Sequence, residues 1–420
     1  SSDLKMVSYP FTWVFPMLLV AIVLFIVLII YGLRKRVLTG NGVVRGFIPF
    51  TLAMIFCGIL GFYGWKLILL MYPQYQEIQH GFTYNGHTYI SFFVLLSLGV
   101  LFGIYYKFSK KINVSNLLIA PLVFWILINI GVAIYLKGAA FFIIPVFLGL
   151  LSLWILIRKD RPNLILLTVI GSIAIFIFAP LVQFFPVGLG LKMLVGSCLF
   201  TALLFGILLP VIGFYKLKKV LAMLFIIVAS LFFIKAHLSS NFSPNRQKPN
   251  SLVYYHDADN NKNYWATYDQ ELDDWTNEYL GDSPEPASSY ISYASGSKYA
   301  KGYKFANVAP NKNIPIFKTV LHKDTVVNQY KEVSFTIFPQ RAVNQISLYT
   351  ADEANFKSLS FNGQIFPLNN NITNAQKIKS KELVRYYVSD KDSLVISYEV
   401  SKNQKVSFTV LEYSYDLLNH

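Results

Sequence analysis

The sequence predicts a multi-pass α-helical membrane domain of about eight transmembrane helices, followed by an all-β, sandwich-like extracytoplasmic domain. Three observations predict this fold class. Only 14% of the 420 residues are charged and 54% are hydrophobic, whereas ordinary soluble domains carry about 25% charged residues. Long apolar runs fill residues 1–237. After a polar, proline-containing linker at 238–250, apolar residues recur with a period of two through 251–420.

Eight apolar segments are long enough to cross a hydrocarbon core, which takes about 20 residues of helix. Each is continuously apolar, so none shows the alternation of a half-buried strand. They cover residues 12–33, 47–71, 89–106, 116–135, 139–157, 163–185, 191–214 and 220–236. We expect one membrane span from each.

The basic residues between these segments predict their orientation. Residues 1–237 hold 18 Lys and Arg against three acids, whereas residues 238–420 hold 19 of each sign. Basic side chains that punctuate apolar runs are typical of a membrane protein and not of a nucleic-acid-binding surface. Thirteen of them follow the first, third, fifth and seventh segments, namely Arg34, Lys35, Arg36, Arg45, Lys107, Lys110, Lys111, Arg158, Lys159, Arg161, Lys216, Lys218 and Lys219. Because positive loops stay in the cytoplasm, both chain ends should be extracytoplasmic.

The positions of the two cysteines suggest the cellular compartment of the polar half. Cys57 and Cys198 both lie inside apolar runs, so the polar half has neither a disulfide framework nor a cysteine-based zinc site. A neutral, cysteine-free outer domain suggests a bacterial inner membrane, with residues 251–420 in the periplasm.

The chain begins Ser1-Ser2-Asp3, without Met or a basic segment before the first span. We therefore expect it to be the later part of a longer polypeptide.

The β half is predicted from short alternating runs between polar turns. The expected strands are 251–256, 263–268, 314–321, 331–338, 344–350, 356–361, 364–368, 383–388, 393–400 and 404–413. Asn362-Gly363 predicts a type I′ hairpin, since both central residues of that turn need positive φ. Many short strands with polar turns favour an antiparallel sandwich. The Ser-, Tyr- and Gly-rich stretch 282–312 is predicted to be a long surface loop.

The stretch Asp257-Ala258-Asp259-Asn260-Asn261 could be a calcium loop, a catalytic acid cluster or a hairpin turn. A calcium loop starting at Asp257 would need Gly at its sixth position and Glu at its twelfth, where Lys262 and Tyr268 stand. We therefore interpret the stretch as a turn, which Asx residues favour. A zinc site is also disfavoured, because His256 alone among the histidines stands directly beside an acid.

The apolar segments contain no Asp, Glu or His, which argues against a proton relay or an intramembrane protease. Asn129 and Gln183 are their main polar residues, and we expect both to form interhelical hydrogen bonds. Lys66, Lys192 and Lys235 should snorkel at the outer helix ends. Trp13, Tyr31 and Trp65 are expected to anchor the interface. We predict no catalytic, cofactor-binding or metal-binding residue in these 420 residues.

One segment has a wider resemblance. Residues 257–281 read DADNNKNYWATYDQELDDWTNEYLG, in which a strand ends in D-A-D, an aromatic pair follows, and an acidic run closes on D-x-W-T. This resembles the C-terminal region of membrane-bound zinc metallopeptidases of the aminopeptidase Y-like class, relatives of the vacuolar membrane protease and the endoplasmic-reticulum metallopeptidase. VSYPFTWVFP, residues 7–16, resembles the start of the first helix after the peptidase domain in that family.

The resemblance implies a peptidase domain, then a multi-helix membrane region, then a β-rich outer domain. The two-zinc site of the family uses an H-x-D motif, a bridging Asp, a Glu-Glu pair and later acidic and His ligands. This chain has no Glu-Glu pair, and His256 and Asp257 lack the surroundings of the motif. The resemblance thus implies that zinc and peptide substrates bind upstream of Ser1. An envelope scaffold without enzyme activity, and a transporter or lipid-handling membrane protein, remain the alternatives.

Overall fold

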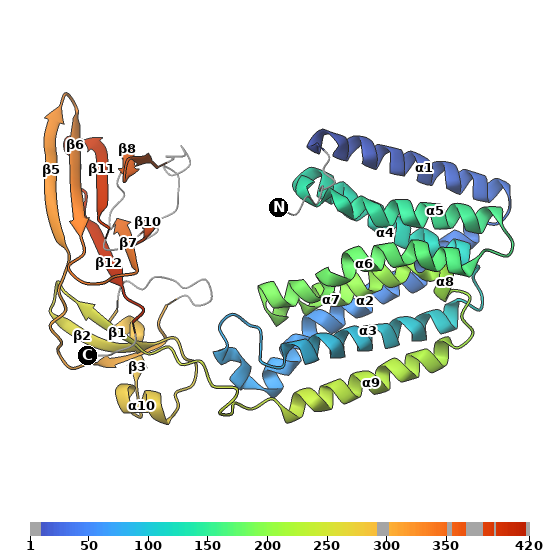
Figure 1. The fold of residues 1–420 in the computed structure, drawn as a ribbon, viewed down its shortest axis with the longest axis horizontal. Coiled ribbons are helices and arrows are strands. Elements are labelled where there is room, and N and C mark those ends of the chain that lie inside the picture. The colour runs from blue at the N-terminus through green and yellow to red at the C-terminus, as the bar shows by residue number, and fades with distance from the viewer. Residues whose placement is uncertain (1–9, 292–301, 351–354, 367–380, 390–391, 417–420) are drawn as a thin grey trace, which may run out of the picture. The chain divides into compact units, whose positions relative to one another are not determined.

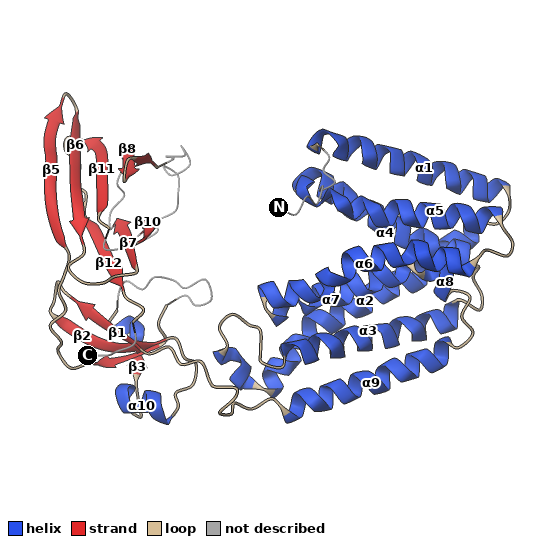
Figure 2. Ribbon diagram, viewed as in Figure 1, coloured by secondary structure: helices blue, strands red, loops and turns tan. Residues whose placement is uncertain are grey.

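The computed structural model describes residues 10–291, 302–350, 355–366, 381–389 and 392–416 (Figure 1). The chain divides into two compact units, Ser1–Pro249 and Asn250–His420. Helices fill the first unit, whereas strands and one short helix make up most of the second (Figure 2). The predicted order, apolar helices first and antiparallel strands after them, is therefore confirmed. The last membrane helix, α9, ends at Leu238.

Seven helical segments of the described chain are long and apolar enough to cross a membrane, one fewer than predicted. The segments are α1 with its preceding 3₁₀ turn (Phe11–Arg34), α2 (Gly40–Met71), α3 (Gly86–Phe108), α4 (Val114–Tyr135), α5 with its preceding 3₁₀ turn (Lys137–Arg158), α6 (Leu164–Leu189) and α9 (Lys218–Leu238).

The expectation of a single long helix over residues 191–214 is wrong. A 3₁₀ turn at Leu191–Met193 leads into α7 (Leu194–Ile207), and a break at Leu208 separates α7 from the short α8 (Leu209–Ile212). Pro210 lies just beyond the break and has no amide hydrogen to continue the helical ladder. Most of α7 is buried by its neighbours, so this segment can be short and broken inside the bundle.

The broken segment still connects the two ends of the bundle. At its start the amide of Leu191 donates a 2.7 Å hydrogen bond to the carbonyl of Gly81, in the loop before α3. At its end Gly213 lies directly against Val114, the first residue of α4. In Figure 1 the segment runs from the end of α6 to the start of α9. The chain therefore still returns across the bundle between α6 and α9.

A proline in α6 shows how α6 and α7 are joined. Pro186 cannot donate the helical hydrogen bond that the carbonyl of Val182, four residues earlier, would otherwise accept. The hydroxyl of Ser197 on α7 donates to that carbonyl instead, at 2.5 Å. A backbone acceptor left free in an apolar environment is costly, so this bond also fixes the two helices against each other.

The second unit contains three antiparallel sheets. Their strand orders are β1-β2-β4-β3, β10-β7-β12 and β5-β6-β11-β8-β9. The strands are β1 (Val253–Asp257), β2 (Lys262–Thr267), β3 (Glu285–Pro286), β4 (Phe305–Val308), β5 (Lys318–Val327), β6 (Tyr330–Phe338), β7 (Gln345–Thr350), β8 (Phe356–Phe361), β9 (Gln364–Ile365), β10 (Lys381–Tyr387), β11 (Leu394–Ser401) and β12 (Phe408–Tyr413). A strand is present in each of the ten expected ranges, with ends that differ by a few residues. Of the expected strand 364–368, residues 367 and 368 lie outside the described residues.

The predicted hairpin at Asn362-Gly363 is confirmed, since both residues have positive φ, 47° and 77°, between β8 and β9. The predicted loop over 282–312 is wrong in part, because β3 and β4 lie within it and pair with each other. Its residues 292–301 lie outside the part of the chain that the structure describes. Glu285 and Pro286 offer only a very short run, and β4 reads FANV, so neither shows a clear alternation.

Hydrophobic packing in the β-region is divided among three clusters. The largest takes residues from the five-stranded and the three-stranded sheets, including Ile337 on β6, Leu348 on β7 and Ile396 on β11, all fully buried. The other two belong to the sheet β1-β2-β4-β3 and its surroundings, one around Tyr264 and Ala306 and one around Trp265. Segment 257–281, which carries the family resemblance, therefore packs in hydrophobic clusters that are separate from the largest one.

Candidate functional site

The stretch Asp257–Asn261 forms the turn of the β1–β2 hairpin, in which Asp257 pairs with Lys262. Its carboxylate is occupied by the turn: Oδ1 accepts the amides of Asp259 and Asn260, both at 3.1 Å, and Oδ2 accepts the side-chain amide of Asn260 at 2.8 Å. Asn261 has a φ of 52°, a left-handed conformation that Asn tolerates well. The interpretation of this stretch as a turn is confirmed.

These hydrogen bonds also affect the pKa of Asp257. Partial burial raises the pKa of the carboxyl, but the hydrogen bonds from Asn260 and Asp259 outweigh burial, so the pKa lies below its ordinary value. A lowered pKa in the folded state means that the turn contributes its stability above the unfolded pKa and loses it as pH falls through the folded pKa.

We expect Asp257→Ala to lower the free energy of unfolding by about 1 kcal/mol at neutral pH, because it removes hydrogen bonds to a charged acceptor. The difference between the variant and the parent should shrink below about pH 4, where the carboxyl becomes protonated even in the unfolded chain. Denaturant unfolding of residues 250–420 at pH 7 and pH 3, with and without calcium, measures both. A calcium-dependent stabilisation lost in the variant would contradict the assignment as a turn.

His256, in this hairpin, and two other histidines are each hydrogen-bonded to a neutral side chain. Nδ1 of His256 lies 2.7 Å from Oδ1 of Asn263, whose amide nitrogen in turn donates to Asn311. His322 is paired with the hydroxyl of Thr336 and His237 with that of Tyr72, each at 2.7 Å. Within the described residues no three His, Cys, Asp or Glu side chains gather in a way that could hold a metal ion.

The acidic end of the resembling segment forms a helix that the sequence analysis missed. In α10 (Asp274–Leu280) the carboxylate of Asp273 accepts the amide of Thr276 at 2.9 Å, and the hydroxyl of Thr276 accepts the amide of Asp273 at 2.8 Å. This reciprocal capping box could have been found, because D-D-W-T places a capping Asp three residues before a Thr. Leu280 at the end of the helix is buried with Trp265.

Asp269 lies between the hairpin and α10, and its side chain is buried. Its Oδ1 accepts the hydroxyl of Ser251 at 2.5 Å and the amide of Ser251 at 3.1 Å. Asp269 therefore ties the start of β1 to the chain that leaves β2. Three of the acids in this segment, Asp257, Asp269 and Asp273, thus accept hydrogen bonds that hold local structure.

The polar residues of the helical unit have separate roles. Asn129 on α4 donates at 2.8 Å to the carbonyl of Phe142, outside its own helix, which confirms the expected interhelical hydrogen bond. Trp65 was expected at the interface but is buried against Tyr75 and Tyr89, because it lies on the face of α2 that packs into the bundle. Gln183 on α6 lies 3.5 Å from Nδ1 of His87 on α3.

The remaining expected anchors stay predictions. Trp13 is exposed and Tyr31 is half-buried, as an interface anchor would be. The side chains of Lys66, Lys192 and Lys235 are also exposed. The ammonium of Lys66 lies 4.1 Å from the ring centroid of Phe62, close enough for a cation–π contact.

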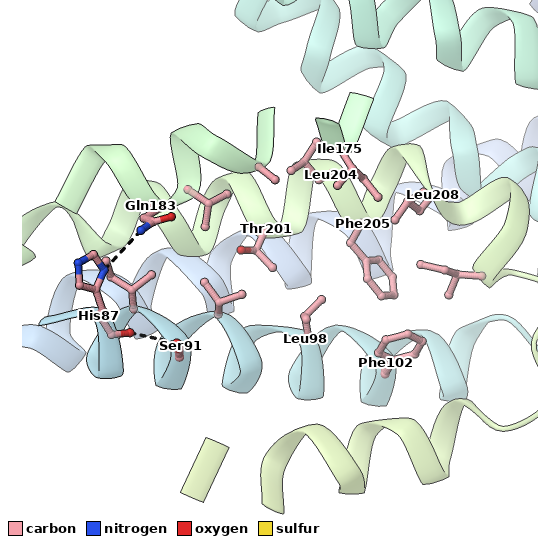
Figure 3. A pocket seen from close by; sticks show the side chains of 15 residues that line it. His87, Ser91, Leu98, Phe102, Ile175, Gln183, Thr201, Leu204, Phe205 and Leu208 are labelled. Carbon is pink, nitrogen blue, oxygen red and sulfur yellow. Dashed lines mark hydrogen bonds between the residues drawn. The ribbon is translucent and has the colours of Figure 1, made fainter. Parts of the chain in front are cut away.

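The Gln183–His87 pair stands at one end of a groove in the helical unit, with a volume of about 790 Å³ (Figure 3). The groove is bordered by α3 and α6, and α7 and α8 line the rest of it. Its lining is His87, Ile90, Ser91, Val94, Leu98, Phe102, Ile175, Ala179, Val182, Gln183, Thr201, Leu204, Phe205, Leu208 and Ile212. Gln183 is the only one of these residues that the sequence analysis singled out, as an intramembrane polar group.

A scan against models of protein families, a search of curated proteins and a search of solved structures each returned no match to this chain.

Proposed function

We propose that this chain is the membrane-anchoring and C-terminal β portion of an envelope zinc metallopeptidase whose catalytic domain lies upstream of Ser1. The helices anchor the enzyme in the bacterial inner membrane, and the β-region covers or orients the peptidase domain in the periplasm. The peptidase domain binds zinc and the peptide substrates. The observation that carries the proposal is the way in which residues 257–281 fold.

The residues that give segment 257–281 its resemblance are joined by contacts within one piece of structure. Asp257 closes the hairpin, Asp273 and Thr276 cap α10, and the ring of Trp265 packs against Tyr279 with centroids 5.0 Å apart. A motif made of such structural contacts supports a shared fold. It does not depend on zinc ligands in this chain, which fits a family whose catalytic domain is separate.

The distribution of charge supports the periplasmic side for the β-region. Arg34 ends α1, Arg158 ends α5, and Lys218 and Lys219 begin α9, so the basic residues gather at the end of the bundle where α9 starts. Basic ends stay in the cytoplasm. The other end of α9, at Leu238, then lies at the periplasmic face, and the β-region follows it.

We also propose that the five-stranded and three-stranded sheets form the two layers of a sandwich. The support is their shared cluster, to which β6, β8 and β11 contribute from one sheet and β7 from the other. Two sheets that bury side chains against each other are the architecture expected from alternating strands of this length.

His256 and Asp257, the adjacent His and Asp of the β1–β2 hairpin, do not fit a zinc site, which supports placing zinc in the upstream domain. Hydrolysis by zinc needs ligands around an open position and a carboxylate that moves a proton. His256 is paired with Asn263, and the carboxylate of Asp257 already accepts three hydrogen bonds in its turn. Neither side chain is placed to bind a metal that would activate water.

The test compares the native polypeptide with residues 1–420 alone. We expect the native polypeptide to carry zinc and to cleave aminopeptidase substrates, with both properties lost after chelation. The 420-residue chain should show neither. Zinc in stoichiometric amount on residues 1–420 would contradict the proposal, as would a native polypeptide without zinc or peptidase activity. The second result would favour an envelope scaffold.

A further inference from the structure

We propose that the groove between α3 and α6 is a binding site for a phospholipid of the periplasmic leaflet, which inserts one acyl chain and places its headgroup at His87 and Gln183. The proposal is independent of the peptidase assignment. It rests on the position of the groove, on its lining and on the hydrogen-bonding groups at its end.

The groove opens sideways between two candidate membrane spans. It is bordered by α3 and α6, both of them candidate membrane spans. His87, Ala179 and Gln183 on its border are exposed, so the groove is open along this side. On its other flank α3 packs against α9 (Figure 3). An opening between two membrane helices faces the hydrocarbon core of the bilayer, which consists of lipid acyl chains.

The lining changes from polar to apolar along the groove. His87, Ser91 and Gln183 are close together at one end, and Leu98, Phe102, Leu204, Phe205 and Leu208 line the rest (Figure 3). Of the polar groups deeper inside, the hydroxyl of Thr201 is already used, since it donates to the carbonyl of Ser197 at 2.7 Å. The deeper part of the groove therefore suits an apolar ligand that forms no hydrogen bonds there.

The polar end matches the headgroup region of a lipid. His87 and Gln183 contact each other only at 3.5 Å, which is longer than a good hydrogen bond. The imidazole and the amide can therefore each donate to a phosphate or ester oxygen. Their end of the bundle is the one opposite the basic loops, so the headgroup belongs to the periplasmic leaflet.

The length of the groove suits a single acyl chain. From His87 to Phe102 it follows α3 for about 22 Å, at 1.5 Å per helical residue. One leaflet contributes about half of a 30 Å hydrocarbon core. A chain whose headgroup sits at His87 can thus lie in the groove over the full depth of its leaflet. No side chain in the lining is acidic or basic apart from His87, so the chain meets no buried charge.

The test uses residues 1–420 purified from a membrane of phosphatidylethanolamine and phosphatidylglycerol and then exchanged into mild detergent. Native mass spectrometry counts the phospholipids that remain. We expect one per chain, because lipid held only at the surface exchanges for detergent. Ala179→Trp should abolish it, since the indole fills the groove from an exposed position on α6. Phe176→Trp is the matched control on the same helix, because Phe176 is 83% exposed and lies outside the lining.

A second variant keeps the test decisive if Ala179→Trp does not fold. Replacing His87 and Gln183 together by alanine changes only exposed side chains, and it should weaken retention about tenfold by removing a hydrogen bond to a charged group. Detergent or no ligand in the groove of the parent chain would overturn the proposal. Retention that is equal in the parent and the second variant would also overturn it. These outcomes leave zinc binding and peptidase activity of the native polypeptide untouched.

Discussion

Replacing Trp265 with alanine should lower the free energy of unfolding of the β-region by about 3–5 kcal/mol, the usual cost of deleting a buried aromatic side chain. Trp265 on β2 is 8% exposed. Its ring packs edge-on against Tyr254 on β1 and Tyr279 on α10, with centroids 5.2 and 5.0 Å apart. The deletion therefore opens a cavity at the point where the hairpin and α10 meet.

Trp275→Ala is the control, since it removes the same side chain from the same segment. Trp275 is 45% exposed and has a ring contact with Tyr279, so its loss should cost less than about 1 kcal/mol. Denaturant unfolding of residues 250–420, followed by far-ultraviolet circular dichroism, measures both variants. Equal costs for the two would show that α10 does not pack on the hairpin as described.

Single cysteines placed in the loops should be either fully labelled or fully protected by a reagent that cannot cross membranes. We expect protection at Gly40, Lys110, Asp160 and Lys216, because they lie in or directly beside the loops that carry the basic clusters. We expect labelling at Gln79, which is exposed in the loop before α3, and at Asn328, in the turn between β5 and β6.

The labelling is done on spheroplasts of a strain in which Cys57 and Cys198 are replaced by alanine, since both are the chain's own thiols. Thr83, although in the same loop as Gln79, is unsuitable because it is buried and donates to Asn85. Lysed spheroplasts provide the control, in which all six positions should react. Labelling at Gly40 or Lys216 before lysis would reverse the assigned orientation.

Much of the fold follows from one-dimensional patterns. Continuous apolar runs predict membrane helices, and alternation of apolar and polar residues predicts strands. The helix α1 and the strand β6 lie at the residues that show these two patterns. The break at Leu208 escapes prediction because residues 191–214 are apolar throughout, and burial by α2, α3 and α6 then permits a short helix. The strands β3 and β4 have too few residues to show a period. They depend on pairing, β4 with β2 and β3 with β4.

The groove could not be predicted from the sequence. Its lining comes from three separate stretches, and Leu98, Ile175 and Leu204 look like any other apolar residue of a membrane helix. Only the packing of α3 and α6 on α7 leaves space between them. The sequence also offers no reason to single out His87 as a binding residue, because it lies at the very start of α3 and has no acidic neighbour in the sequence.

The hydrogen bonds beyond the end of α9 tie the chain that follows this helix to the helical unit. The side-chain amide of Asn85 donates to the carbonyl of Ala236, and the hydroxyl of Tyr84 donates to the carbonyl of Gln247 at 2.8 Å. The guanidinium of Arg246 donates to the carbonyl of Ser239 at 2.7 Å. A segment tied down by its backbone carbonyls in this way is a poor substrate for proteolytic nicking, although it lies outside any regular helix or strand.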